Sequence, residues 1–176
     1  MTTAAVPTSA WRAVPAATRT PGARAPVDLA ALRYLIVDDS RFYRSVIKTA
    51  LAAVRLTNVG EAVDGSDALQ AMRAGAVDFV LVDYDMPVLN GIEFVRTVRW
   101  SEDSGIDPRI PIIMISQYAH QAVVVEARNA GVHEFLTKPV SPQLLYERIR
   151  ATLCHPRAFI VTESYRGPDR RWMKRD

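Results

Sequence analysis

The chain has 176 residues, 49% hydrophobic and 23% charged, so it can bury one sizeable core, and a second full domain would be a tight fit. Its one cysteine, Cys154, excludes a disulfide within the chain, and no apolar run is long enough to span a bilayer. The net charge of +3 comes from the two ends, which argues against a nucleic-acid-binding domain, and we expect a cytoplasmic protein with no membrane partner.

Composition divides the chain into three parts. Residues 1–30 carry a net charge of +2, are rich in alanine, proline and threonine, and show no sustained period, which predicts a disordered arm. Residues 31–154 carry −2 and alternate short apolar runs with helical periods. Residues 155–176 carry +3 and form a basic C-terminal tail with several aromatic residues.

The middle part predicts five strands and five helices in alternation. The apolar runs predict strands over residues 34–37, 56–62, 79–82, 112–115 and 134–136. The helical periods cover residues 41–53, 66–74, 91–100, 119–130 and 142–153. Ser40 and Ser141 are expected N-caps, and Gly75 and Gly131 are expected helix exits. This alternation with short links predicts an α/β fold with a doubly wound, five-stranded parallel sheet.

Polar side chains follow four of the five expected strands. They are Asp38 and Asp39 after the first strand, Asp83 and Asp85 after the third, Ser116 after the fourth and Lys138 after the fifth. In the flavodoxin-like strand order 2-1-3-4-5, these four strands are neighbours and their carboxyl ends meet at one edge of the sheet. We therefore expect these side chains to converge on one pocket.

The residue types in this pocket point to phosphoryl transfer. Three or four neighbouring carboxylates repel one another unless a cation joins them, and Mg²⁺ suits such an oxygen-rich cluster. Lys138 can pair with a carboxylate or with a phosphoryl oxygen, and Ser116 offers a hydroxyl donor. Asp83 is the best candidate nucleophile, because it directly follows the most apolar strand at the centre of the expected sheet.

Four ordered motifs resemble the receiver domain of bacterial two-component response regulators. The motifs are Leu35–Ser40, Val82–Pro87, Ile113–Ser116 and Leu136–Pro139, and the resemblance covers roughly residues 31–154. It implies a flavodoxin-like receiver in which Asp83 accepts a phosphoryl group from a sensor histidine kinase or a histidine phosphotransfer protein. Because 23 residues follow Leu153, we expect a stand-alone, chemotaxis-regulator-like receiver rather than a direct transcription factor.

The resemblance also implies a metal site. By position, Asp39 would bind Mg²⁺ directly, and Asp38 would bind it through water or help to place it. The Asp83 carboxylate and the backbone carbonyl of Asp85 would complete the protein ligands.

A phosphorylation switch is the third implication of the resemblance. Ser116 and Lys138 would contact the phosphoryl oxygens, and Phe135 would be the aromatic residue that reports phosphorylation. Phosphorylation would pull Ser116 toward Asp83, turn Phe135 inward and remodel the surface of the fourth helix, fifth strand and fifth helix. That surface would then bind a downstream protein target or a second copy of the chain.

Several positions depart from the common family pattern and are candidates for tuning. Gln117 stands where a small residue is usual, and Tyr118 follows it, so phosphorylation is expected to be slow or unusually long-lived. Asp85 lies where family members vary and where side chains touch the attacking water. Phe135 lacks the hydroxyl of the tyrosine often found there, so an inward ring leaves no polar group unsatisfied.

Other functions remain open at this point. We expect no enzyme activity beyond the chain's own phosphorylation and dephosphorylation, but a constitutive pseudo-receiver scaffold or a phosphorelay intermediate would carry the same fold. Asp83 and Asp85 also fit the Asp-x-Asp motif of haloacid dehalogenase phosphatases, although Met86-Pro87 fits that family poorly.

The tail carries two further patterns. Phe159–Val161 predicts a short extended segment, and residues 165–172, including Arg166 to Trp172, form a turn rich in arginine and aromatic residues. The tail is either solvated or docked on a protein or on the fourth or fifth helix of its own chain. Nucleic-acid binding by so few basic residues would be weak and salt-dependent.

Overall fold

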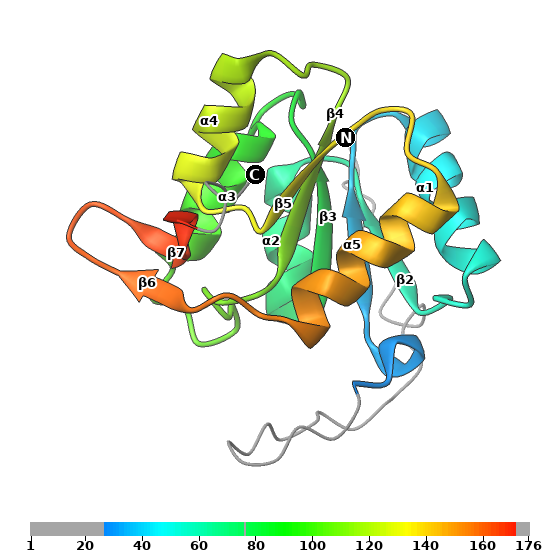
Figure 1. Ribbon diagram of the computed structural model, residues 1–176, viewed down its shortest axis with the longest axis horizontal. Coiled ribbons are helices and arrows are strands. Elements are labelled where there is room, and N and C mark those ends of the chain that lie inside the picture. The colour runs from blue at the N-terminus through cyan, green and yellow to red at the C-terminus, as the bar shows by residue number, and fades with distance from the viewer. Residues whose placement is uncertain (1–26, 76, 172–176) are drawn as a thin grey trace.

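A parallel sheet with helices on both faces forms the body of the molecule (Figure 1). The computed structural model describes residues 27–75 and 77–171. The strand order is β2-β1-β3-β4-β5, which confirms the prediction of a doubly wound, flavodoxin-like fold. The strands are β1 (Tyr34–Val37), β2 (Val59–Ala62), β3 (Phe79–Asp83), β4 (Ile112–Ser116) and β5 (Glu134–Thr137).

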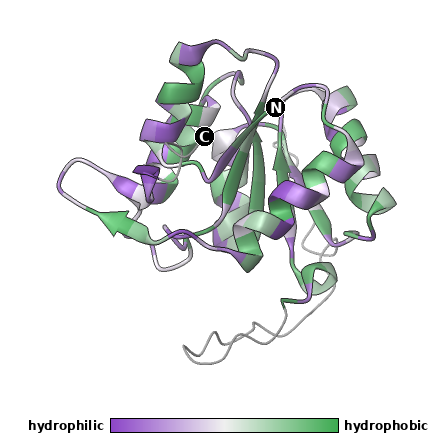
Figure 2. Ribbon diagram, in the orientation of Figure 1, coloured by the Kyte–Doolittle hydropathy of each residue, from purple (hydrophilic) through white to green (hydrophobic). Residues whose placement is uncertain are grey.

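Five helices connect these strands and cover the two faces of the sheet. They are α1 (Arg41–Ala53), α2 (Gly65–Ala74), α3 (Gly91–Arg99), α4 (Gln121–Ala130) and α5 (Pro142–Cys154). Side chains alternate along each strand, so Ile36 and Leu81 pack against α1 and α5, whereas Val37 and Val82 pack against α2, α3 and α4. Figure 2 shows the central strands of the sheet as strongly hydrophobic. The buried sheet gives the loops at its carboxyl edge a rigid base.

The ends of the elements follow local chemistry, with one correction. Ser40 and Ser141 accept backbone hydrogen bonds as N-caps, as predicted. Gly131 and Gly75 end α4 and α2, as predicted; the φ of Gly131 is 104°, whereas Gly75 is extended. The predicted strand 56–62 begins only at Val59, because the chain first turns at the end of α1. There the φ of Arg55 is 64°, and the Leu56 amide donates to the Leu51 carbonyl.

The two ends of the chain lie partly outside the described residues. Across the predicted boundary between residues 30 and 31, Leu29–Ala31 form a 3-10 helix capped by the Asp28 side chain, so regular structure begins before residue 31. Residues 1–26 of the predicted N-terminal arm, and Trp172 in the tail, lie outside the described residues. Within residues 27–75 and 77–171, the helices lack the combination of length and apolar character that crossing a bilayer requires.

The C-terminal tail forms a β-hairpin. Strands β6 (Phe159–Val161) and β7 (Arg166–Pro168) pair antiparallel, and the Tyr165 hydroxyl donates to the Pro168 carbonyl. Figure 1 shows the hairpin in orange and red beside the lower ends of α3 and α4. The described part of the tail therefore docks on its own chain, next to α4.

Candidate functional site

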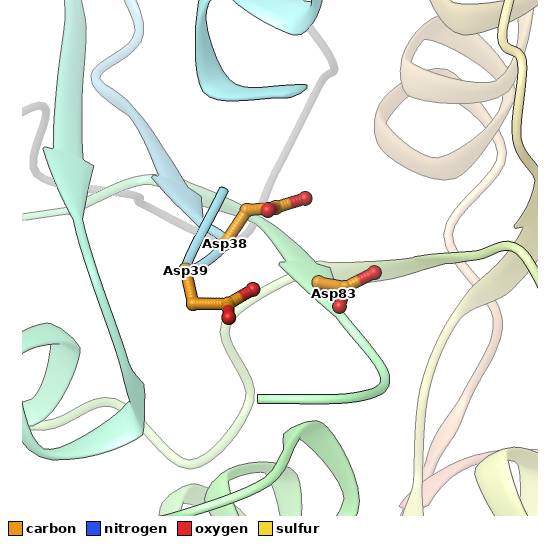
Figure 3. Close-up of side chains that lie close together, drawn as sticks. All are labelled: Asp38, Asp39 and Asp83. Carbon is orange, nitrogen blue, oxygen red and sulfur yellow. The ribbon is translucent and has the colours of Figure 1, made fainter. Parts of the chain in front are cut away.

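Three aspartates meet where β1 and β3 end. Oxygen atoms of Asp38, Asp39 and Asp83 all lie within 4.8 Å of one another (Figure 3). Val37 and Val82 are register partners in adjacent parallel strands, so the residues that follow them emerge side by side. Asp38 and Asp83 are buried, and Asp39 is exposed. Three hard oxygen donors, one of them open to solvent, fit the ligand chemistry of Mg²⁺.

The loop after β1 is held by an arginine that sequence reasoning missed. Arg44 donates to the backbone carbonyls of Asp38, at 2.8 Å, and Asp39, at 3.2 Å. Its Nε atom lies 3.1 Å from Glu61 Oε2, which fixes the guanidinium from the β2 side. The Ser40 amide also donates to Asp38 Oδ1. These bonds fix the backbone of Asp38 and Asp39 and orient the Asp38 carboxylate before any ligand arrives.

Lys138 bridges the two buried aspartates of the acidic cluster. Its ammonium lies 2.7 Å from Asp38 Oδ2 and 2.7 Å from Asp83 Oδ1, and it sits 4.0 Å from the centre of the Tyr43 ring. Burial lowers the pKa of Lys138, but its hydrogen bonds to the two carboxylates, and their charges, outweigh burial and raise the pKa above its ordinary value. Lys138 therefore stays protonated and supplies a fixed positive charge.

The buried Asp83 carboxylate is destabilised as an anion. Burial raises its pKa above the ordinary value, and the opposing hydrogen bond and charge of Lys138 only partly offset this. The Asp85 amide donates to Asp83 Oδ2 at 3.1 Å, while the Asp85 side chain is exposed. A bound cation would remove this penalty, so the geometry favours metal binding at Asp83.

The Asp83→Asn variant is expected to raise the melting temperature by a few degrees at neutral pH in EDTA. Because the folded pKa of Asp83 lies above the unfolded value near 3.8, its ionisation opposes folding increasingly as pH rises through the folded pKa. Asparagine resembles the protonated form, so the gain should vanish in acid, below the unfolded pKa. Thermal unfolding across pH would check this, with the exposed Asp85→Asn as control. A gain that is largest in acid would contradict the assignment.

Ser116 and Phe135 lie on the next strands along the sheet. Ser116 is buried at the end of β4, and its Oγ accepts a hydrogen bond from the Tyr118 amide at 3.0 Å. Phe135 is half-buried on β5 and packs against the core beneath α2, α3 and α4. The exposed Gln117 lines a cavity that Lys138 also lines. The structure thus places Ser116 and Gln117 beside the site and Phe135 on the face of the sheet that α4 covers.

Sequence reasoning also missed the close approach of the start of α3 to the backbone of Asp83. A Cβ atom on Gly91 would lie 2.1 Å from the backbone oxygen of Asp83, so only glycine fits at the start of α3. The Gly91 amide donates to the Tyr84 carbonyl, and Asn90 and Glu93 form a capping box around it. The Asn-Gly step with Glu three residues after Asn is the signal that could have identified this constraint.

Comparison with known proteins assigns the chain to a family. Residues 34–150 match the response regulator receiver domain family. The chain is 36% identical over 118 residues to the chemotaxis protein CheY of Pseudomonas aeruginosa, covering 67% of this chain and 93% of that protein. It is 38% identical over 123 residues to the chemotaxis protein CheY1 of Helicobacter pylori, covering 69% of this chain and 97% of that protein.

Solved structures agree with this assignment. The chemotaxis protein CheY4 of Vibrio cholerae superposes with a TM-score of 0.61 at 29% identity, covering 68% of this chain and 96% of that one. The receiver domain of the sensor histidine kinase PA1611 from Pseudomonas aeruginosa has a TM-score of 0.61 at 27% identity, with 68% and 94% coverage. That structure holds a magnesium ion in its active-site cleft. With its sheet order, its acidic cluster and these matches, the chain belongs to the response regulator receiver domain family.

Proposed function

We propose that the chain is a phosphorylation-driven switch in which Asp83 accepts a phosphoryl group from a histidine kinase or a histidine phosphotransfer protein. The observation that carries the proposal is the Lys138 ammonium held 2.7 Å from the carboxylates of both Asp38 and Asp83. An ammonium held beside a buried carboxylate of the candidate metal site can neutralise the oxygens of a phosphoryl group attached there. The likeness to chemotaxis regulators supports the same function.

The transfer itself uses groups that are already in place. An Asp83 carboxylate oxygen attacks phosphorus while the bond from phosphorus to the donor nitrogen breaks, and the electron pair stays on the imidazole. Lys138 moves from the Asp83 carboxylate to a phosphoryl oxygen. The Ser116 hydroxyl, whose oxygen accepts a hydrogen bond from the Tyr118 amide, donates its hydrogen to another phosphoryl oxygen. The ammonium of Lys138 thus exchanges one anionic oxygen for another in the same pocket.

Asp38, Asp39 and Asp83 would hold Mg²⁺, with the backbone carbonyl of Asp85 as a further ligand. When bound, the ion neutralises the carboxylates and the transferring phosphoryl group. The PA1611 receiver, with magnesium in its cleft, supports this assignment.

An apolar surface beside the site suits the docking of the phosphodonor protein. The Phe42 side chain is 69% exposed and Val46 is 38% exposed, both on α1. They line a cavity of about 380 Å³ together with Lys138 and Pro139. Exposed apolar residues around a reactive centre are typical of protein interfaces. A donor docked there would bring its histidine next to Asp83.

The output surface is proposed to be α4, β5 and α5. Phe135, on β5, packs against the same core that α4 covers, so a change in its packing would move α4. The partner would be a downstream protein or a second copy of the chain. We further propose that the protein acts in the cytoplasm and turns over no free substrate, its chemistry being limited to its own phosphorylation and dephosphorylation.

Incubation with acetyl phosphate and Mg²⁺ tests this function. We expect the intact mass to rise by one phosphoryl group, and EDTA to prevent the rise. Asp83→Asn should abolish it, whereas Asp85→Asn, which changes an exposed carboxylate in the same loop, should leave phosphorylation in place. A folded wild-type protein that takes up no phosphoryl group, or an Asp83→Asn variant that still does, would overturn the proposal.

A further inference from the structure

The C-terminal hairpin lies outside the receiver family match and is built onto the turn between α4 and β5. A Cβ atom on Gly167 in β7 would lie 2.8 Å from the Cα atom of Gly131, the residue that ends α4. A Cβ atom on Gly131 would lie 2.7 Å from the Arg166 backbone oxygen. The two backbones therefore touch at a point where any side chain on either residue would separate them.

Arginines of the hairpin and its linker extend this contact along α4. The Arg157 guanidinium donates to the His133 carbonyl in the turn and, at 3.3 Å, to the Asp169 carbonyl in the hairpin. Arg170 donates to Asn129 in the last turn of α4 at 2.9 Å. Arg166 stacks 4.4 Å from the centre of the Trp100 ring at the end of α3. The hairpin thus joins the ends of α3 and α4 to the start of β5.

The same turn is also held from inside the domain. Arg99 is fully buried and donates to the Gly131 carbonyl at 2.9 Å, and its guanidinium faces the Phe159 ring of the hairpin at 5.6 Å. His133 is buried and accepts a hydrogen bond from the Ile112 amide at 3.1 Å. The α4–β5 turn is therefore clamped between a buried arginine and the hairpin.

The other end of α4 is held less firmly. Its N-cap residue His120 makes no side-chain capping bond within the described part of the chain. The buried residues of α4 are Ala127 and Ala130, both in its second half. Firm contacts at one end and sparse contacts at the other allow a helix to swing about its fixed end.

We propose that the hairpin sets the switching equilibrium of the receiver by holding the α4–β5 turn in its unphosphorylated arrangement. This inference rests on the proposed phosphorylation switch, since Phe135 follows His133 by two residues. Contacts that exist in one state stabilise that state, and their loss shifts the population toward the other. Arg157 and Gly167 are then positioning residues that act on Asp83 through the turn and β5.

Beryllofluoride, which mimics a phosphoryl group on aspartate, tests this in the full chain with Mg²⁺. Gly167→Ala should crowd the Tyr165 ring within the hairpin and push the hairpin away from Gly131. Arg157→Ala should remove the anchor of the hairpin on the His133 carbonyl. The control is Glu163→Ala, at the exposed hairpin turn. We expect both variants to bind beryllofluoride roughly fivefold more tightly than wild type and the control to bind it equally. Amide hydrogen exchange in α4 should also become faster in both variants.

The outcomes separate the two proposals. If wild type binds beryllofluoride, but variants with a loosened hairpin bind it no more tightly and protect α4 as wild type does, the hairpin inference is overturned. If folded wild type binds no beryllofluoride at all, the phosphorylation switch is overturned, and with it the role of the hairpin in switching. Faster exchange of the β6 and β7 amides is the check that the substitutions loosened the hairpin.

Discussion

Replacing Lys138 with methionine is expected to destabilise the metal-free protein by about 3 kcal/mol, because two buried carboxylates lose their shared counter-ion. Methionine keeps most of the side-chain volume, so the loss is electrostatic. Mg²⁺ can replace the missing positive charge, and we expect much of the lost stability to return when the ion is added. Urea unfolding in EDTA and in excess Mg²⁺ measures both effects.

The same Lys138→Met substitution should lower the rate of phosphorylation by acetyl phosphate roughly hundredfold, since the variant lacks the fixed ammonium that contacts the phosphoryl oxygens and Mg²⁺ alone remains to neutralise them. Lys48→Met is the matched control, because Lys48 forms an ion pair of the same length, 2.7 Å with Glu61, but its side chain is 53% exposed. Exposed pairs contribute little, so the control should behave as wild type. A Lys138→Met protein with wild-type stability in EDTA and a wild-type phosphorylation rate would contradict the site.

Arg99→Met is expected to destabilise the domain by about 4 kcal/mol, which makes it the most damaging change away from the site. Arg99 donates to the backbone carbonyls of Pro108, Ile110 and Gly131 and lies 3.4 Å from His133 Nδ1. Burial lowers the pKa of Arg99 to about 9, so the guanidinium remains charged at neutral pH. Methionine would leave these buried carbonyls without their donor.

Denaturant unfolding of Arg99→Met and of Arg96→Met measures this effect. Arg96 lies one turn earlier on α3, is 55% exposed, and pairs with Glu126 at 3.8 Å, so Arg96→Met should change stability by less than about 1 kcal/mol. Equal effects of the two substitutions would show that the buried guanidinium does not support the fold.

The features predicted from the sequence are those that local pattern determines. Apolar runs rich in branched residues became β1, β3 and β4, and Asp38, Asp83 and Lys138 met because parallel strands end at one edge of the sheet. Predicted strand boundaries were wrong where the backbone conformation, rather than the hydrophobic pattern, determines where an element starts. The turn at Arg55, with its positive φ, ends α1 and delays β2 in a way that hydrophobicity alone does not reveal.

The features that sequence reasoning missed depend on contacts between distant residues. In an amphipathic helix a charged residue normally faces solvent, yet Arg99 is buried because carbonyls up to 32 positions away accept its hydrogen bonds. The sequence of the aromatic tail was equally compatible with a solvated and with a docked segment. Its docking depends on the close approach of Gly131 and Gly167, which lie far apart in the sequence. Likewise, the ring of Tyr43 beneath Lys138 follows from the packing of α1 against the loop after β5.

The most direct test of the account is chemical identification of the phosphorylated residue. Borohydride reduces an aspartyl phosphate to homoserine, so protein treated with acetyl phosphate and Mg²⁺, then reduced and digested, carries the change at the acceptor. We predict that peptide mass spectrometry finds homoserine at Asp83 and at no other aspartate of the site. Homoserine at Asp38, Asp39 or Asp85, with Asp83 intact, would contradict the account.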